Sequence, residues 1–165
     1  LTSYFDWFYS STMFFRVFDY EHFTDLQQNI DSRDTIGFSL GYHVVKNKRI
    51  QWDVTLGPSY QETSYYNTSQ DSDQRSGVIA LGTLFDYSIS SRLDYLLDYQ
   101  LQFVEENSGK RNSHLKTGFE FDFRNDFELD FSFYWDRVAH PVAPAGTTPP
   151  HPNDYRLVLS LGYDF

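Results

Sequence analysis

The segment from Asn153 to Phe165 reads NDYRLVLSLGYDF and alternates strictly between large apolar residues and other residues. The apolar set comprises Tyr155, Leu157, Leu159, Leu161, Tyr163 and Phe165. Because successive side chains of a β-strand point to opposite faces, this pattern predicts a strand with one apolar face. In a soluble domain such an exposed edge strand would invite aggregation. The fold class therefore depends on what surrounds this strand.

The same two-residue period recurs along the chain, and a helical period of 3.6 residues is not found. It predicts eight strands, at about 6–18, 33–45, 49–60, 77–88, 92–103, 113–124, 127–137 and 154–165. The connections between them alternate in length. The short ones are VKNKR, SISSR and RNDF, and the long ones are DYEHFTDLQQNIDSR, QETSYYNTSQDSDQRS, VEENSGKRNS and VAHPVAPAGTTPPHPND. This alternation is typical of outer-membrane barrels, whose short turns face the periplasm and whose long loops face outward.

Composition narrows the possible partners. The chain has 165 residues and a formal net charge of -10, which argues against a nucleic-acid partner because no basic stripe is present to meet phosphates. It has no cysteine, so disulfides and thiolate metal sites are excluded. Its 16 Phe and 13 Tyr suit strands that keep one face apolar.

The volume of the apolar side chains decides which face of the sheet points outward. An eight-stranded barrel is only just wide enough inside for side chains, so the roughly forty bulky apolar groups of this pattern cannot fit there. The opposite face carries small residues, namely Gly37, Gly41, Gly57, Gly82, Gly118, Gly162, Ser39, Ser132 and Ser160. We therefore expect a single domain over 1–165, an all-β, antiparallel, up-and-down transmembrane β-barrel. Its expected location is the bacterial outer membrane, in contact with lipid and lipopolysaccharide.

The terminal strand has a second expected role, in assembly. An alternating strand that ends in an aromatic residue can add to a sheet edge of the barrel insertion machinery by β-augmentation. The predicted assembly signal consists of Tyr155, Leu157, Leu159, Leu161, Tyr163 and Phe165.

Two segments resemble a known family. GYHVVKNKRIQWDVTLGPSYQE (41–62) and FSFYWDRVAHPVAPAGTTPPHPNDYRLVLSLGYDF (131–165) are similar to salt-induced outer-membrane proteins, domain of unknown function 481. The resemblance implies an outer-membrane barrel and no particular chemistry. It also implies that this chain corresponds to the C-terminal two thirds of the family's barrel, with about four further strands ahead of it. We therefore expect that the chain does not close on itself but belongs to a barrel of about twelve strands. The missing strands would precede this sequence or come from another chain, while closure by eight strands alone is the other possibility.

The inward-facing positions include charged residues, with acids more numerous than bases. The predicted lumen network comprises Arg16, Asp53, Asp98, Lys116, Glu120, Asp122, Asp130 and Arg156. One interpretation is a set of cross-strand ion pairs that makes the barrel rigid. The other is a cation-preferring passage lined by acidic side chains.

No catalytic, cofactor or metal site is predicted. Carboxylates two residues apart, such as Glu120 and Asp122, follow from strand alternation alone. The histidines are scattered, with most in loops or at strand ends, at His22, His43, His114, His140 and His151. We expect a structural or envelope-stress role without enzymatic activity. The alternatives are a small cation-preferring channel and, third, a lipid-modifying enzyme.

Overall fold

The chain forms one antiparallel sheet. The computed structural model describes residues 2–66, 73–105, 109–123, 127–143, 146 and 148–163. Its strands are β1 (Thr2–Phe8), β2 (Met13–Asp25), β3 (Ile30–Lys46), β4 (Ile50–Tyr65), β5 (Asp73–Ser90), β6 (Leu93–Phe103), β7 (Arg111–Asp122), β8 (Phe127–Val138) and β9 (Asn153–Tyr163). A short 3-10 helix, η1 (Leu26–Gln28), joins β2 to β3. Among these described residues, no helix is long and apolar enough to cross a bilayer.

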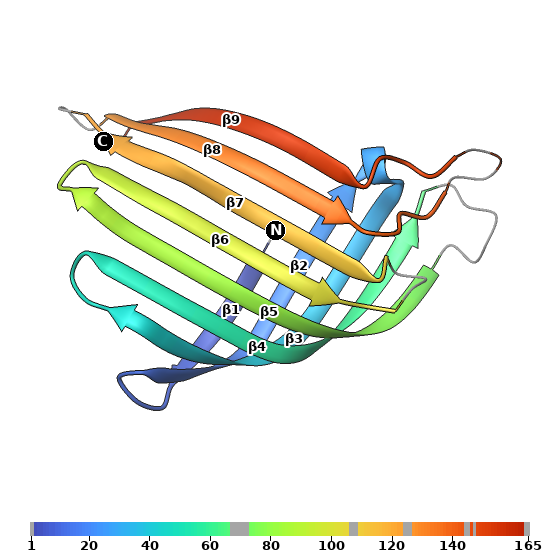
Figure 1. Ribbon diagram of the computed structural model, residues 1–165, viewed down its shortest axis with the longest axis horizontal. Helices are drawn as coiled ribbons and strands as arrows, with labels where there is room; N and C mark the ends of the chain where they lie inside the picture. The colour runs from blue at the N-terminus through green and yellow to red at the C-terminus, as the bar shows by residue number, and fades with distance from the viewer. Residues whose placement is uncertain are drawn as a thin grey trace.

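Within these described ranges, each strand pairs only with its neighbours in the sequence, in the order β1 to β9. The predicted all-β, antiparallel, up-and-down fold is thus confirmed. The sheet curls so that β1, β2 and β3 pass behind β5 to β9 (Figure 1). The turns β1–β2, β3–β4 and β5–β6 lie at one end of the sheet, on the left in Figure 1, which we call the short-turn end. The other end, where η1 lies, is called the long-loop end.

Strands β1 and β9 form the two edges of the sheet. In the described part of the chain, β9 pairs with β8 and β1 pairs with β2, and no ladder joins β9 to β1. The expectation that the final strand does not pair with the N-terminal one is confirmed. The further strands that would complete a larger barrel stay a prediction.

The prediction of one strand at 6–18 is wrong, because that range contains a hairpin. Strands β1 and β2 are joined by a turn in which the Ser10 hydroxyl accepts hydrogen bonds from the backbone N–H groups of Thr12 and Met13, at 3.2 and 3.0 Å. The apolar alternation is interrupted in this turn, because position 11 between Tyr9 and Met13 is a serine. The polar run Ser10–Thr12 is therefore the sequence signal of the break, since serine and threonine hydroxyls favour turns.

Strands also extend into two predicted long loops. Strand β2 continues to Asp25 and β3 begins at Ile30, so most of the connection predicted at 19–33 is strand. Likewise, β4 continues to Tyr65 and β5 begins at Asp73, within the connection predicted at 61–76. Asp25 ends β2 by accepting hydrogen bonds from the backbone N–H groups of Gln27 and Gln28, at 2.9 and 3.1 Å. These strand ends carry polar residues on both faces, so they lack the apolar alternation that identifies a strand.

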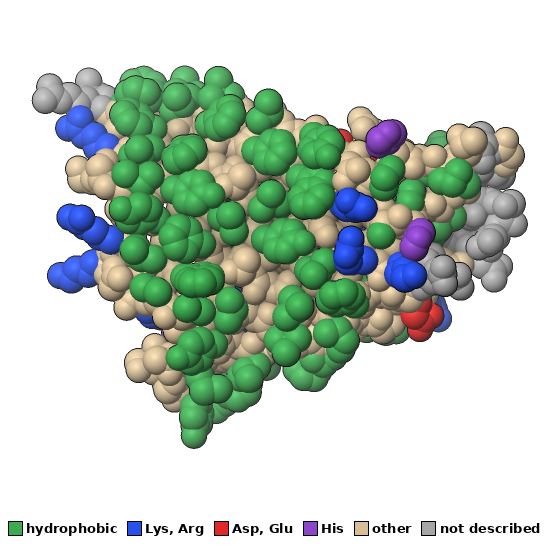
Figure 2. Space-filling model, in the orientation of Figure 1, with side chains coloured by type: hydrophobic (Ala, Val, Ile, Leu, Met, Phe, Trp, Pro, Cys, Tyr) green, Lys and Arg blue, Asp and Glu red, His purple; other side chains and the backbone are tan. Residues whose placement is uncertain are grey.

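The outward face is apolar, as the volume argument predicts. On β9, for example, the side chains of Leu157 and Leu161 are 68% and 70% exposed. Other exposed apolar side chains lie on every strand and include Trp7, Phe15, Phe38, Leu40, Leu56, Ile79, Leu81, Phe103, Phe119, Phe131, Tyr155, Leu159 and Tyr163. Figure 2 shows the face in view as largely hydrophobic, with Lys and Arg side chains towards its two ends.

The inward face is packed at the long-loop end. Ile30, Tyr65 and Val138 form a buried cluster with Phe23 and Val142 packed against it. Some contacts here cross the interior and join strands that are not paired with each other in the sheet. The ring centroids of Phe23 on β2 and His114 on β7 are 5.2 Å apart. These contacts hold β2 and β3 against the opposite wall of the curled sheet.

Candidate lumen site

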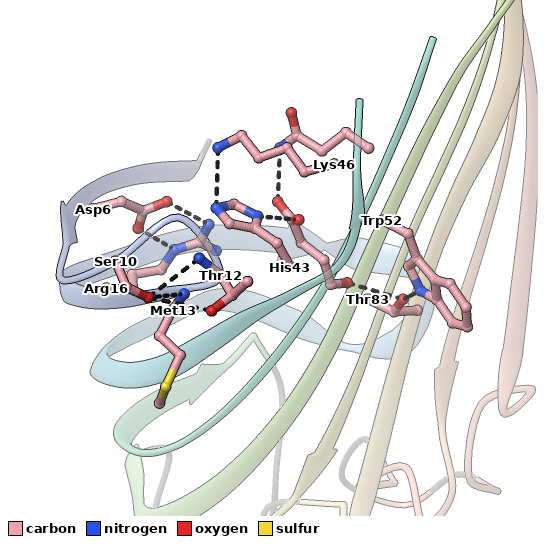
Figure 3. A network of polar contacts seen from close by, with 11 residues as sticks. Asp6, Ser10, Thr12, Met13, Arg16, His43, Lys46, Trp52 and Thr83 are labelled. Atoms are coloured by element: carbon pink, nitrogen blue, oxygen red, sulfur yellow. Dashed lines mark hydrogen bonds and ion pairs between the residues drawn. The ribbon is translucent and has the colours of Figure 1, made fainter. Parts of the chain in front are cut away.

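The first group of polar residues on the inward face lies near the β1–β2 turn (Figure 3). The Arg16 guanidinium donates to the Asp6 carboxylate at 2.8 and 3.2 Å, and its Nη1 is 4.0 Å from Asp19. The Arg16 guanidinium also lies 4.0 Å from the Tyr4 ring centroid. A bulge between Arg16 and Asp19 lets both side chains face inward although they are three residues apart. Arg16, a predicted lumen residue, is thus held by carboxylates from β1 and β2.

The second group joins β3 to β4 at the same end. His43 Nδ1 is 2.6 Å from Asp53 Oδ1, and both side chains are buried. Lys46 Nζ lies 3.1 Å from His43 Nε2, while the Gln51 side-chain amide donates to Asp53 at 2.7 Å. The Phe14 ring packs against the imidazole with centroids 5.0 Å apart. Asp53 is a predicted lumen residue, whereas its partner His43 is not in the predicted network. The alternation of Tyr42 and Val44 is the signal that places His43 on the inward face.

The third group lies on β7, β8 and β9. His114 Nδ1 is 2.6 Å from Asp136 Oδ1, and the Arg156 guanidinium donates to the other oxygen of Asp136. Arg156 also lies 3.4 Å from Asp154. Its guanidinium is 5.7 Å from the Tyr134 ring centroid. His43 and His114 are therefore inward strand residues with aspartate partners, whereas the sequence pattern places most of the five histidines in loops or at strand ends.

The fourth group consists of carboxylates near the short-turn end of β5 to β8. Glu120 is directly opposite Asp130, and Asp122 is opposite Glu128. Carboxylate oxygens of Glu120, Glu128 and Asp130 lie within 4.8 Å of one another. These residues form no ion pair with a base within the described part of the chain. Adjacent like charges are destabilising, so this group is structurally costly.

The remaining predicted residues lie between these groups. Asp98 on β6 is directly opposite Lys116 on β7. Lys116 Nζ also lies 6.0 Å from the Tyr134 ring centroid. A cavity of about 220 Å³ separates β2 from β6 to β9, and its lining residues include Glu21, Phe23, Asp98, His114, Lys116, Tyr134, Asp136 and Arg156. The predicted network is thus several local clusters around a partly open interior, not one ring.

The inward polar face and outward apolar face define the chain as an antiparallel, meandering sheet protein of the β-barrel type. The family described as "Protein of unknown function, DUF481" matches residues 3–165. The chain belongs to this family. No curated protein matches it.

Proposed function

We propose that this protein is part of a β-barrel in the outer membrane of a Gram-negative bacterium, with a structural or envelope-stress role and no enzymatic turnover. The observation that carries the proposal is the outward apolar face, which extends over β1 to β9. A soluble monomer rarely exposes contiguous apolar patches above a few hundred Å², whereas lipid accommodates them.

The inward contacts support a structural role. Arg16 and Arg156 are held by aspartates, and Asp53 and Asp136 each bond to a histidine. Such cross-strand contacts fix neighbouring strands relative to each other. Neither histidine has a serine or threonine hydroxyl within hydrogen-bond reach of its second ring nitrogen among the described residues, which speaks against a hydrolase of the Ser–His type.

Cell fractionation tests this proposal. We expect the protein in the outer-membrane fraction, resistant to salt and carbonate washes. The folded protein should migrate faster on a detergent gel than the same sample after boiling, because a barrel stays compact in detergent until it is heated. Recovery from the soluble fraction without a heat-dependent shift would contradict the proposal.

A cation-preferring channel is the second candidate, favoured by the carboxylates of Asp86, Asp94, Glu120 and Asp130 around one inward cavity. Rings of acidic side chains favour cation passage. The packed long-loop end opposes this function, because Phe23 and its neighbours fill the interior there.

Single-channel recording on the purified protein separates the two candidates. The structural proposal predicts no stable conductance. A stable, cation-preferring conductance that falls in Asp98→Asn or Asp130→Asn would instead establish the channel. Ser160→Ala, an inward change without charge on β9, serves as the control and should leave any conductance unchanged.

A further inference from the structure

A second, smaller cavity lies within the curled sheet between β2 and β6. Its volume is about 30 Å³. Glycines on β4 and β5 help to make this space, and the lining is rich in side-chain oxygen atoms, those of Asp19, Glu21, Thr35, Ser39, Thr55, Ser59, Gln100 and Gln102. Since one water needs about 10–15 Å³ on this measure, the cavity has room for about two water-sized groups.

Three buried oxygens of this lining have no hydrogen-bond partner within the described residues. They are Thr35 Oγ1, Ser39 Oγ and Gln102 Oε1. Thr35 is 7% exposed and Gln102 is 2% exposed. Buried polar atoms normally have partners, so oxygens left without one beside a cavity point to a bound group.

Two of these oxygens are placed around the same carboxylate. Thr35 on β3 lies directly opposite Glu21 on β2. From β6, the Gln102 side-chain nitrogen donates to Glu21 Oε2 at 3.2 Å. Because its nitrogen is engaged in this bond, Gln102 presents its oxygen as the remaining polar atom. The cavity therefore gathers a carboxylate, a hydroxyl and an amide oxygen from three different strands.

The charges around the cavity are not balanced. Two carboxylates, those of Asp19 and Glu21, line the cavity, and no Lys or Arg is among its described lining residues. Arg16 lies 4.0 Å from Asp19 but is engaged more closely by the Asp6 carboxylate, at 2.8 Å. The described lining thus carries negative charge and no base of its own.

We propose that this cavity is a binding site for one hard metal cation, coordinated by oxygens of Glu21, Thr35 and Gln102, with Asp19 contributing negative charge. Hard cations such as Ca²⁺ and Na⁺ are held by carboxylate, amide and hydroxyl oxygens. The bound cation would be coordinated by two of the three unpartnered oxygens, those of Thr35 and Gln102, and would join β2, β3 and β6 across the interior. This role goes beyond the proposed function and requires no transport.

Equilibrium dialysis of the purified, detergent-solubilised chain tests the site directly. The protein is first treated with a chelator and dialysed into choline chloride, and then exchanged into CaCl2, NaCl or KCl at equal ionic strength. We expect saturable uptake of one cation per chain from one of these salts, measured by elemental analysis. The unfolding midpoint should rise in the same salt relative to choline chloride, because a ligand that binds the folded state stabilises it. Comparison of the salts distinguishes a divalent from a monovalent cation.

Variants locate the bound cation. Glu21→Gln, which keeps the size but removes the charge, should weaken binding at least tenfold, and Thr35→Val should weaken it by removing one oxygen. Ser132→Ala is the matched control, since it also removes one inward hydroxyl, but on β8 and outside the cavity. Asp130→Asn removes an inward charge elsewhere. Both controls should bind with unchanged affinity, and circular dichroism checks that each variant is folded.

Two outcomes would overturn the site. Equal behaviour of the protein in choline and in all three metal salts would mean that water alone fills the cavity. Loss of binding in Asp130→Asn with full binding in Glu21→Gln would place the cation at the carboxylates of the short-turn end. Because binding is measured on purified protein, either result is independent of whether fractionation supports an outer-membrane location.

Discussion

At the residue scale, a single aromatic side chain explains why one inward position is glycine. A Cβ atom added to Gly41 on β3 would lie 2.1 Å from the Phe14 ring. That ring is 1% exposed and packs against Phe8 and His43, so it has little freedom to move. Gly41 thus provides the space in which Phe14 fills the short-turn end of the interior.

Replacing Gly41 by alanine should therefore destabilise the fold. We expect Gly41→Ala to lower the free energy of unfolding by about 1–3 kcal/mol through overpacking, measured by urea titration of the refolded protein. Gly77→Ala is the control, because a Cβ at Gly77 meets nothing within 4 Å. Adding Phe14→Leu to Gly41→Ala should cost less than the sum of the two changes. Strict additivity would show that the ring is not the obstacle.

At the element scale, the sequence predicts strands best where every second residue, on the outward face, is apolar. Leu157 and Phe131 were placed on the outward face because every second residue there must be apolar, and both are exposed. The period fails where the chain is polar on both faces, as in the extended ends of β3 and β4. It also fails at the β2 bulge, which shifts the alternation so that Phe23 faces inward.

The terminal strand makes a prediction about assembly. Removal of Phe165, or Phe165→Asp, should strongly reduce the amount of protein in the outer membrane, because the insertion machinery would lose an apolar contact of the strand that it pairs with. Phe165 lies outside the described residues, while β9 before it presents the rest of the predicted signal on one outward face. Quantitative immunoblotting of membrane fractions measures the effect. Val158→Ala, a change on the inward side of β9, should assemble normally, and equal levels of all variants would refute the signal.

At the scale of the whole molecule, the positions of the turns predict an orientation in the membrane. Because this 165-residue sequence has no cysteine, a single introduced cysteine reports accessibility without background from these residues. Tyr66→Cys at the long-loop end should react with a membrane-impermeant maleimide on intact cells. Lys48→Cys in the β3–β4 turn should react only after lysis. The opposite pattern would reverse the proposed orientation.

The candidate site could be predicted only in part, and the reason lies at this scale. The alternation of apolar and other residues along each strand predicts that Arg16, Asp98 and Lys116 face inward. This prediction needs only the residues next to each of them in the sequence. The contacts of Phe23 with His114 and of Glu21 with Gln102 depend on how far the sheet curls. The curvature of the sheet brings together strands that are distant in the sequence, and no local sequence pattern predicts that curvature. The cation site proposed above belongs to this second kind of feature.

The neighbour-only strand order has a consequence for how such proteins can change during evolution. Every ladder in the described part of the chain joins consecutive strands. A hairpin is therefore a unit that can be duplicated or lost without changing how the remaining strands connect. A gene could thus lengthen or shorten the sheet by two strands at a time while each inherited pair keeps its register. The diameter of the barrel then becomes a trait that varies in steps of one hairpin.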